Sequence, residues 1–424
     1  MELESIFNRV KDAKLAINGG LKVRTKPMPT RMAFGEAEYS MLQEAVHFYQ
    51  KLGADPGYQG PFEQRYCEAF VETLGGGYAD AVSTGSGAVY LAIAALSLPK
   101  GSEVIVSPIT DPGTISAIIM NGLKPKLADA RPDDYNMGVN QFLDRVSPEV
   151  SAAVIVHCAG QATDIDQIVQ HAQKTNIRIV EDCSQAHGAQ IMGRPVGTFG
   201  DIAAFSTMYR KIHITGGSGG VVYSRDRDLF RQALAHADRG KPRWINDFDD
   251  RNPETFLYPA LNWNTDELSC AIGIASLQRL SSTILRRQAF VSELASLLDD
   301  LDTMFIMLPW TPASSPFIVP VFVDPDRCNQ PKMNVAEALR AEGIDLNPHY
   351  RYVVSEWPWL KPFLADDFAT PVALSNRDRS FCLYLNENYG LQEAEDVATA
   401  MLKIHQNWGL PSKKPKQIIP IYAQ

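Results

Sequence analysis

The 424-residue sequence lacks the features of several large classes of protein. None of its apolar runs approaches the roughly 18 residues that a membrane-spanning helix needs. Its N-terminus alternates charged and apolar residues, whereas a signal peptide has an uninterrupted apolar core. Internal repeats and low-complexity segments are absent from the sequence. We therefore expect a globular cytoplasmic protein that does not associate with membranes.

Excess positive charge and paired cysteines are missing as well. The formal net charge is -9, whereas a nucleic-acid-binding protein usually carries a basic patch. The six cysteines form no C-x-x-C pair and no cluster with histidine at the spacing of metal ligands. We expect free thiols, no bound metal and no nucleic-acid partner. A small anionic ligand remains compatible with this charge.

Short apolar runs alternate with helical patterns between residues 78 and 225. This alternation predicts βαβ units and a mostly parallel sheet covered by helices on both faces. Ligands of such sheets bind at the carboxyl ends of the strands. The expected strands are 103–107, 152–157, 177–182, 202–206 and 220–224, and the expected helices are 86–97, 114–121, 139–146 and 164–175.

The second part of the chain predicts a smaller α/β domain, and a chain of this length favours two packed units. A helical pattern covers residues 265–302, with Asn264 as the expected N-cap and Glu267 completing a capping box. This long helix is expected to bridge the two domains. The expected division is an N-terminal segment (1–32), a large domain (33–285), a small C-terminal α/β domain (286–410) and a solvated tail (411–424); within the small domain we expect a strand at 316–324 and helices at 334–343 and 391–407.

A single lysine, Lys211, precedes the glycine-rich stretch "GGSGG" at residues 216–220. A Walker loop, which binds nucleotide phosphates, has its glycines before the lysine, so the order here argues against nucleotide hydrolysis. Lys211 follows the expected strand 202–206 by a few residues, close to Ser206. Taken alone, it can be a solvated charge, a paired charge or a nucleophile.

Two other strand-end features accompany this lysine. The small residues Gly85, Ser86 and Gly87 open an expected helix, where unpaired N–H groups and a hydroxyl can bind a phosphate or form a plain cap. Glu181 and Asp182 close an apolar strand, either as a ligand contact or as a cap or ion pair. Adjacent side chains of a strand point to opposite faces, so only one of these two carboxylates can easily reach a given ligand.

Together these features match the requirements of pyridoxal 5'-phosphate (PLP). Its phosphate needs N–H and hydroxyl donors, its pyridinium nitrogen needs an anion, and its aldehyde needs an amine for a Schiff base. The sequence supplies all three in consecutive βα units.

The order of several motifs resembles the DegT/DnrJ/StrS family of PLP-dependent sugar aminotransferases over residues 33 to 408. The motifs are "TGSGA" (84–88), "VHCAGQATDID" (156–166), "EDCSQAHGA" (181–189), "VGTFGDIAAFST" (196–207), Lys211 before "GSGG", "LNWNTDELSCAIGIASLQRL" (261–280) and "GIDLNPHY" (343–350). The resemblance implies the type I PLP-dependent transferase fold: a large domain with a mostly parallel seven-stranded sheet flanked by helices, and a smaller C-terminal α/β domain.

The resemblance also implies a role for individual residues. Lys211 is expected to form the Schiff base and to move the proton between cofactor and substrate. Asp182 is expected to pair with the pyridinium nitrogen, and Gln185 to donate to the phenolic oxygen of the cofactor. Glu181, one position away from the motif, is expected to be structural. The expected phosphate contacts are Gly85, Ser86 and Ser206.

Seven further positions are weaker candidates. The family works as a homodimer with shared active sites, and Asn262 matches the position that reaches the phosphate of the neighbouring subunit; an ordinary helix cap is the alternative. His349 matches a residue near the substrate entrance or is a surface histidine in a loop, and His213 can assist proton transfer or simply pack. Pro112 occupies the expected place of an aromatic residue that stacks on the cofactor ring, a departure that points to an atypical substrate. Arg239, Lys241 and Arg351 are candidates for gripping an anionic group or are plain exposed charges.

The expected reaction is the transfer of an amino group from an amino acid, L-glutamate or glutamine, to a ketone. The expected acceptor is a nucleotide-linked keto-sugar or a keto-cyclitol. A branch of the family that removes a sugar hydroxyl replaces the lysine by histidine, so Lys211 favours amino transfer. Dehydration by related PLP chemistry and a non-catalytic regulatory role are the alternatives.

Overall fold

The computed structural model describes residues 2–411, without the side chains of residues 2–5 and 300, so the expected tail lies outside the described residues from 412 onward. Its largest sheet follows the spatial order β1-β9-β8-β5-β4-β2-β3. β9 runs antiparallel to both of its neighbours, and the β2, β3, β4, β5 and β8 pairs are parallel. The prediction of a mostly parallel seven-stranded sheet is confirmed. The strands are β1 (Tyr78–Val82), β2 (Glu103–Val106), β3 (Lys124–Leu127), β4 (Val150–Val156), β5 (Arg178–Asp182), β8 (Ile202–Ser206) and β9 (Gly220–Ser224).

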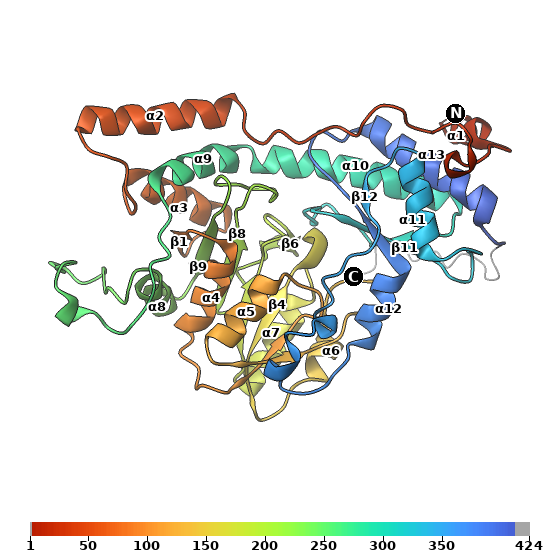
Figure 1. Cartoon of the computed structure of the whole chain (residues 1–424). Coiled ribbons are helices and arrows are strands. Elements are labelled where there is room, and N and C mark those ends of the chain that lie inside the picture. Colours follow the sequence, from red (N-terminus) through yellow and green to blue (C-terminus); the bar gives the residue numbers. More distant parts are fainter. Residues whose placement is uncertain (1, 412–424) are drawn as a thin grey trace.

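Helices cover both faces of this sheet (Figure 1). In β8, Ile202 and Ala204 pack against the layer of α4 and α8, whereas Ala203 and Phe205 pack against α3 and α9. The period-two alternation of buried apolar residues therefore builds two cores, one on each face. The covering helices are α3 (Pro61–Thr73), α4 (Gly85–Ala95), α5 (Pro112–Met120), α6 (Val139–Leu143), α7 (Ile165–Thr175), α8 (Arg227–Ala237) and α9 (Glu267–Gln278); α2 (Glu36–Leu52) packs on α9, and β6 (Gln190–Ile191) and β7 (Arg194–Pro195) form a separate hairpin.

The expected single helix at 265–302 is wrong in two respects. The structure has two helices, α9 and α10 (Leu280–Leu301), bent by 54° at Arg279. The N-cap of α9 is Asp266, whose carboxylate accepts from the Ser269 N–H at 2.8 Å. Glu267 is fully buried and accepts from the backbone N–H groups of Phe62 and Glu63, so it satisfies the first turn of α3 instead of capping its own helix.

Across residues 2–411 no single helix is long and apolar enough to cross a membrane. The bent pair of α9 and α10 together has the length and the apolar composition of a membrane-spanning segment, and only by these two criteria. Much of α9 is buried in the protein core, including Cys270, Ala271 and Ile272.

The C-terminal part contains a second, antiparallel sheet in the order β10-β11-β13-β12. Helices α10, α11 and α13 supply much of its hydrophobic core. The expected strand and both expected helices are present. The predicted domain boundary at residue 285 falls within α10, and the exact bounds of the domains remain predictions. The elements are β10 (Phe305–Met307), β11 (Val319–Val323), α11 (Lys332–Ala341), β12 (Leu346–Asn347), α12 (Pro371–Arg379), β13 (Ser380–Leu383) and α13 (Leu391–Trp408).

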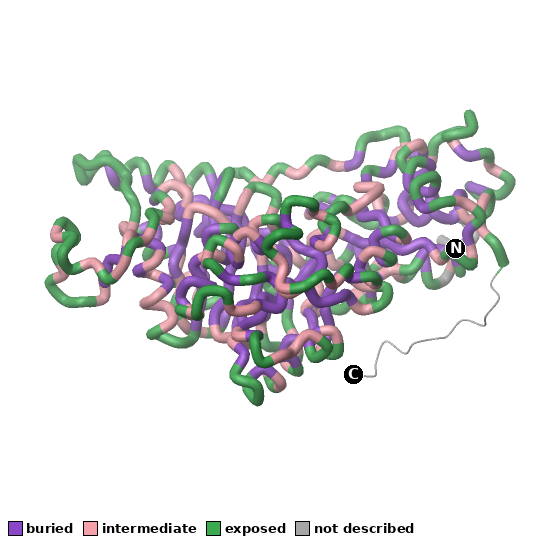
Figure 2. The backbone as a smooth tube through the Cα atoms, turned by 60° about the horizontal axis from the view of Figure 1, so that its bottom comes forward, coloured by how far each residue is buried: buried purple, intermediate pink, exposed green. Residues whose placement is uncertain are grey.

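The N-terminal segment docks on this C-terminal unit. Helix α1 (Glu2–Val10) packs against α13 (Figure 1). Its residues Ile6 and Val10 are buried in the same core. Figure 2 shows that buried backbone runs through both parts of the molecule. The buried carboxylate of Glu342 accepts from the Lys403 ammonium at 2.8 Å. It also accepts from the Ala16 N–H at 2.8 Å, so a buried ion pair anchors the N-terminal chain.

The docking of α1 predicts a stability difference between two neighbouring side chains. Ile6 is 0% exposed and Phe7 is 47% exposed. Ile6→Ala should reduce the free energy of unfolding by about 3 kcal/mol, because it leaves a cavity in the core of the C-terminal unit. Phe7→Ala should change it by less than about 0.5 kcal/mol. Denaturant unfolding measures both, and equal effects would contradict the docking of α1.

Candidate active site

The loops that follow the strands of the large sheet enclose a cavity of about 330 Å³. Parallel strands end at one edge of a sheet, so their loops bring side chains from distant sequence positions together. The cavity collects six of the residues that the sequence singled out: Gly85, Ser86, Asp182, Gln185, Ser206 and Lys211.

One end of the cavity is the N-terminus of α4. Thr84 caps the helix, and its hydroxyl accepts from the Gly87 N–H at 2.8 Å. A Cβ at Gly85 would overlap the side chain of Ser206, so glycine is what allows the helix to approach the end of β8. Free N–H groups at a helix start and the hydroxyls of Ser86 and Ser206 together suit an anion such as a phosphate.

Asp182 occupies the cavity wall at the end of β5 and is 4% exposed. One carboxylate oxygen accepts from the Thr114 hydroxyl at 2.8 Å, and the other accepts from the Ser184 N–H at 3.1 Å. Thr110 in turn donates to the Thr114 hydroxyl at 3.0 Å. These contacts fix the carboxylate and leave it lone pairs for a ligand N–H. Sequence reasoning missed Thr110 and Thr114.

Lys211 reaches the cavity from the loop between β8 and β9. Its Nζ atom lies 4.7 Å from the centroid of the Phe317 ring. Burial lowers the pKa of the Lys211 ammonium, while the nearby carboxylates of Asp182 and Asp111 oppose that shift. At a given pH, a larger fraction of Lys211 is therefore in the neutral, nucleophilic amine form than in an exposed lysine.

Gln185 is oriented by the turn after β4. Its side-chain oxygen accepts from the Ala159 N–H at 2.9 Å. Ala159 has a left-handed backbone, with φ of 62°, and this conformation turns its N–H toward Gln185. Because the oxygen is engaged, the NH₂ group of Gln185 is the part that can donate to a ligand.

A second cavity of about 640 Å³ adjoins the first. Asp111, Gln185, Met208 and Lys211 line both cavities, so Lys211 stands at their junction. The outer cavity also draws on residues 31–34 and on the C-terminal unit. Its wall is rich in tyrosine: Tyr209, Tyr350, Tyr352 and Tyr384.

The structure leaves Pro112 outside both cavities. Pro112 is the exposed first residue of α5, and the wall at this loop consists of Thr110, Asp111 and Thr114. Asp111 is the N-cap of α5 and accepts from the Gly113 N–H at 2.8 Å. The Asp-Pro pair in the sequence could have predicted that α5 begins here, because aspartate favours the N-cap and proline the first turn.

The two candidate histidines do not line either cavity. His213 is fully buried and hydrogen-bonds the Tyr66 hydroxyl at 2.7 Å and the Ser276 hydroxyl at 3.0 Å, which is a packing role. His349 accepts from the Lys332 ammonium at 3.1 Å, two residues from Asn347 on the outer wall.

The remaining candidates also lie outside the cavities. Asn262 is exposed, and its side-chain oxygen accepts from the Asn264 N–H at 3.0 Å. Arg239 and Lys241 pair with the buried carboxylate of Asp238, at 2.8 and 3.8 Å. Arg351 is exposed and lines neither cavity.

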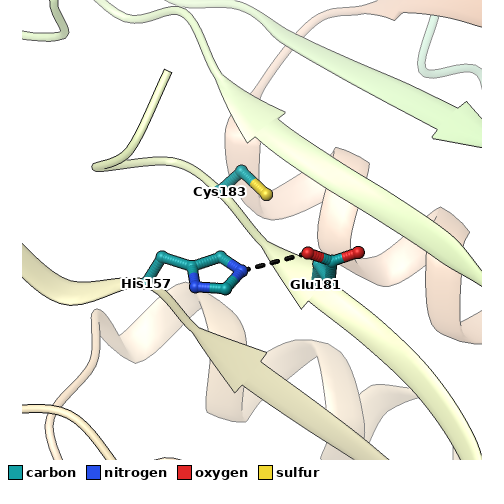
Figure 3. A group of neighbouring side chains, drawn as sticks. All are labelled: His157, Glu181 and Cys183. Carbon is teal, nitrogen blue, oxygen red and sulfur yellow. Dashed lines mark hydrogen bonds and ion pairs between the residues drawn. The ribbon is translucent and has the colours of Figure 1, made fainter. Parts of the chain in front are cut away.

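Glu181 points away from the cavity into a group with His157 and Cys183 (Figure 3). Its oxygens accept from His157 Nε2 at 3.1 Å and from the N–H groups of Gly197, Phe199 and Gly200. The other histidine nitrogen, Nδ1, accepts from the Thr163 N–H at 3.2 Å. The geometry resembles a metal-ligand set, but hydrogen bonds already occupy the histidine and the carboxylate, so the group is structural.

Comparison with known proteins identifies the class of protein. The fold is that of an aminotransferase. The model of the DegT/DnrJ/EryC1/StrS aminotransferase family matches residues 43–402. The chain belongs to this family, as its motifs predicted.

Individual relatives share between 22% and 31% sequence identity with this chain. GDP-perosamine synthase of Escherichia coli O157:H7 is 31% identical over 54% of this chain, and the match spans 61% of that protein. The putative L-glutamine:3-amino-2,3-dideoxy-scyllo-inosose aminotransferase of Streptoalloteichus tenebrarius is 28% identical over 85% of this chain and 90% of its own length. The structure of GDP-4-keto-6-deoxymannose-3-dehydratase with a trapped PLP-glutamate geminal diamine has the same fold, with a TM-score of 0.80 and 22% identity over 89% of this chain and 100% of that one.

The group around Glu181 predicts insensitivity to metal ions. Added zinc ions should not raise the unfolding temperature. Glu181→Gln should destabilise the protein by about 3 kcal/mol, because the NH₂ group of glutamine cannot accept from buried N–H donors. Cys183→Ala should cost less. A zinc-dependent rise in the unfolding temperature that Cys183→Ala abolishes would contradict the structural role.

Proposed function

We propose that the protein is a PLP-dependent aminotransferase. It moves an amino group from an amino-acid donor to a ketone acceptor. The donor is L-glutamate or glutamine, and the acceptor is a nucleotide-linked keto-sugar or a keto-cyclitol. The observation that carries this proposal is the convergence of Lys211, Asp182 and the N-terminus of α4 on one cavity. The functions of GDP-perosamine synthase and of the scyllo-inosose aminotransferase support the choice of a ring ketone as acceptor.

The residues of the inner cavity fit PLP in charge and in position. The N-terminus of α4 with Ser86 and Ser206 would hold the phosphate, and Asp182 would hold the pyridinium N–H. Gln185 would donate to the phenolic oxygen. When bound, PLP supplies an electron sink that makes the C–H bond at the amine-bearing carbon acidic.

Lys211 performs the steps that belong to the protein. Its amine would condense with the aldehyde carbon of the cofactor, forming a C=N bond while the aldehyde oxygen leaves as water. Once substrate displaces it, the same amine would take the proton from the amine-bearing carbon and return it at the carbon that bore the aldehyde. The lowered pKa of Lys211 suits the attack on the aldehyde and the removal of the proton, since each needs the neutral amine. The ammonium formed by that removal is the acid that returns the proton.

The outer cavity suits a polyhydroxylated ring. Its tyrosine hydroxyls and the amides of Asn347 and Asn386 can donate and accept hydrogen bonds. Asp111 adds a carboxylate next to Lys211 at the loop where the family usually has an aromatic residue. This difference supports an acceptor that departs from the usual substrates of the family.

Dehydration is the second candidate reaction. The likeness to GDP-4-keto-6-deoxymannose-3-dehydratase, at 22% identity, reflects the common fold. The lysine in the cavity favours amino transfer, because transfer requires an amine that can leave and rebind on every cycle. A non-catalytic role is disfavoured because both Lys211 and Asp182 line the cavity.

We infer a cytoplasmic homodimer with shared active sites. Asn262 is exposed and outside the cavities of its own chain, where a second copy could meet it. Several large apolar side chains are also exposed on α2 and near Asn262, which is typical of an interface. They are Tyr39, Phe48, Leu52, Leu257 and Leu261.

The lysine has a direct test. Lys211→Ala should reduce turnover by at least about 10³-fold, because the variant loses both the covalent link and the proton carrier. The exposed Lys124→Ala on β3 should retain full activity. Amine product is measured with glutamate or glutamine as donor against a panel of keto-sugar nucleotides and keto-cyclitols. Appreciable amine transfer by Lys211→Ala would refute the assignment.

Donor dependence separates transfer from dehydration. The wild-type protein should form product only when an amino acid is present in stoichiometric amount, and the product should contain its nitrogen. Isotopically labelled glutamine or glutamate followed by mass spectrometry measures this. A deoxygenated product that carries no label would instead support the dehydratase.

The charges around Lys211 predict a pH profile. The rate at which the protein without cofactor captures PLP should rise with pH through the pKa of Lys211, because only the neutral amine attacks the aldehyde. Asp111 raises that pKa, so Asp111→Asn should move the midpoint to lower pH. The exposed Asp228→Asn is the control. A midpoint that stays in place or moves to higher pH contradicts this account.

A further inference from the structure

Backbone and side-chain hydrogen bonds hold the loop that carries Lys211, residues 207–219. The Lys211 N–H donates to the Met208 carbonyl at 2.8 Å, and the Ile214 N–H donates to the Ser276 hydroxyl at 3.0 Å. Backbone bonds from Thr207 to Gly219 and from Thr215 to Thr207 join its two ends, at 2.9 and 2.8 Å. The carbonyls of Tyr209 and Ile212, on either side of Lys211, both accept from the Arg31 guanidinium, at 2.9 and 3.4 Å. Within residues 2–411 no other donor reaches these two carbonyls.

Arg31 belongs to an N-terminal segment without regular secondary structure, residues 29–35, which we call the strap. Asn386 donates to the Pro29 carbonyl at 2.8 Å, and Asn388 donates to the Thr30 carbonyl at 2.9 Å. On the other side, Arg279 donates to the Ala33 carbonyl at 2.8 Å. The strap therefore connects the C-terminal unit with the end of helix α9, and residues 31–34 line the outer cavity.

Glu387 joins Arg31 to a second, buried guanidinium. Its two oxygens accept from Arg31 Nε at 3.1 Å and from Arg287 Nη2 at 2.8 Å. The side chains of Arg287, Glu387 and Arg31 are 1%, 11% and 15% exposed, so water screens these charges weakly. Burial alone would raise the pKa of Glu387, but the two guanidinium groups hold it below its usual value.

Arg287 extends the same network to the other side of Lys211. It donates to the Pro316 carbonyl at 3.3 Å. The next residue is Phe317, whose ring centroid lies 4.7 Å from Lys211 Nζ. Glu387 is thus connected both to the backbone beside Lys211 and to the ring that contacts its amine.

We propose that Arg31, Glu387 and Arg287 form an ionic clamp that positions Lys211, with Arg31 as the positioning residue for the lysine loop. The planar guanidinium can bond two carbonyls and a carboxylate at once, which an ammonium on a flexible chain cannot do in the same geometry. The inference rests on the role proposed for Lys211, but the positioning itself can be measured without any reaction.

Amide hydrogen exchange of the protein without cofactor tests the clamp. Arg31→Met should increase exchange in residues 207–219 by about tenfold or more, while α11 and α13 keep wild-type protection. Arg31→Lys, which retains the charge, should give a smaller increase. Asn388→Ala is the matched control, since it releases the strap at Thr30 and does not contact the lysine loop. It should leave exchange in residues 207–219 unchanged.

The lysine itself supplies a second readout. After loading with PLP, the fraction linked to Lys211 is trapped with borohydride, and the pH at which the lysine-bound chromophore titrates is recorded. We expect Arg31→Met to lower the trapped fraction, to shift that titration and to reduce kcat by about tenfold or more, and Asn388→Ala to match wild type.

Three outcomes overturn the clamp: unchanged exchange of residues 207–219 in Arg31→Met, equal effects of Arg31→Met and Asn388→Ala, or a wild-type chromophore titration in Arg31→Met. If Arg31→Met does not fold, Arg31→Lys carries the same comparison. A protein that transfers no amine but shows the expected exchange differences would refute the proposed function and support the clamp.

Discussion

The opposite orientation of two adjacent carboxylates at the end of β5 organises the site. Asp182 faces the cavity, where Thr114 and Ser184 hold it, and Glu181 faces the opposite core. Glu181 binds the N–H groups of residues 197–200, the turn that leads into β8, and β8 leads to Lys211. One strand end therefore presents the anion for a ligand and also anchors the chain that brings the amine.

The chemistry at Lys211 depends on a balance between burial and charge. Desolvation favours the neutral amine, and without opposing charges a buried ammonium is costly. Asp182 and Asp111 moderate that cost. Because Asp111 also borders the outer cavity, the same carboxylate influences both the lysine and whatever acceptor binds there. Reactivity and substrate choice are coupled at this residue.

Local sequence patterns predicted much of the fold and the inner cavity. The apolar strands, the motifs at their ends and the family resemblance singled out Lys211, Asp182 and Gln185, and the structure brings these three residues to one cavity, because the strand ends of a parallel sheet converge. Their roles stay predictions. Contacts between distant segments left no local pattern. The sequence pattern predicts that Glu267 completes the capping box of its own helix, but its carboxylate accepts a hydrogen bond from the first turn of α3 instead. The docking of α1 on the C-terminal unit depends on packing across the whole chain, and the choice of Asp111 over Pro112 depends on how α5 begins.

The charged character of the contact between strap, lysine loop and C-terminal unit has a physical rationale. Apolar side chains of similar volume could join these segments with equal or greater stability, since burying an ion pair is costly. They would not specify where the carbonyls beside Lys211 lie, because apolar contacts are non-directional. Arg31 fixes both carbonyls by directed hydrogen bonds, and Glu387 fixes Arg31 relative to Arg287. The ionic network therefore gives positional accuracy at the one loop where the proposed chemistry demands it.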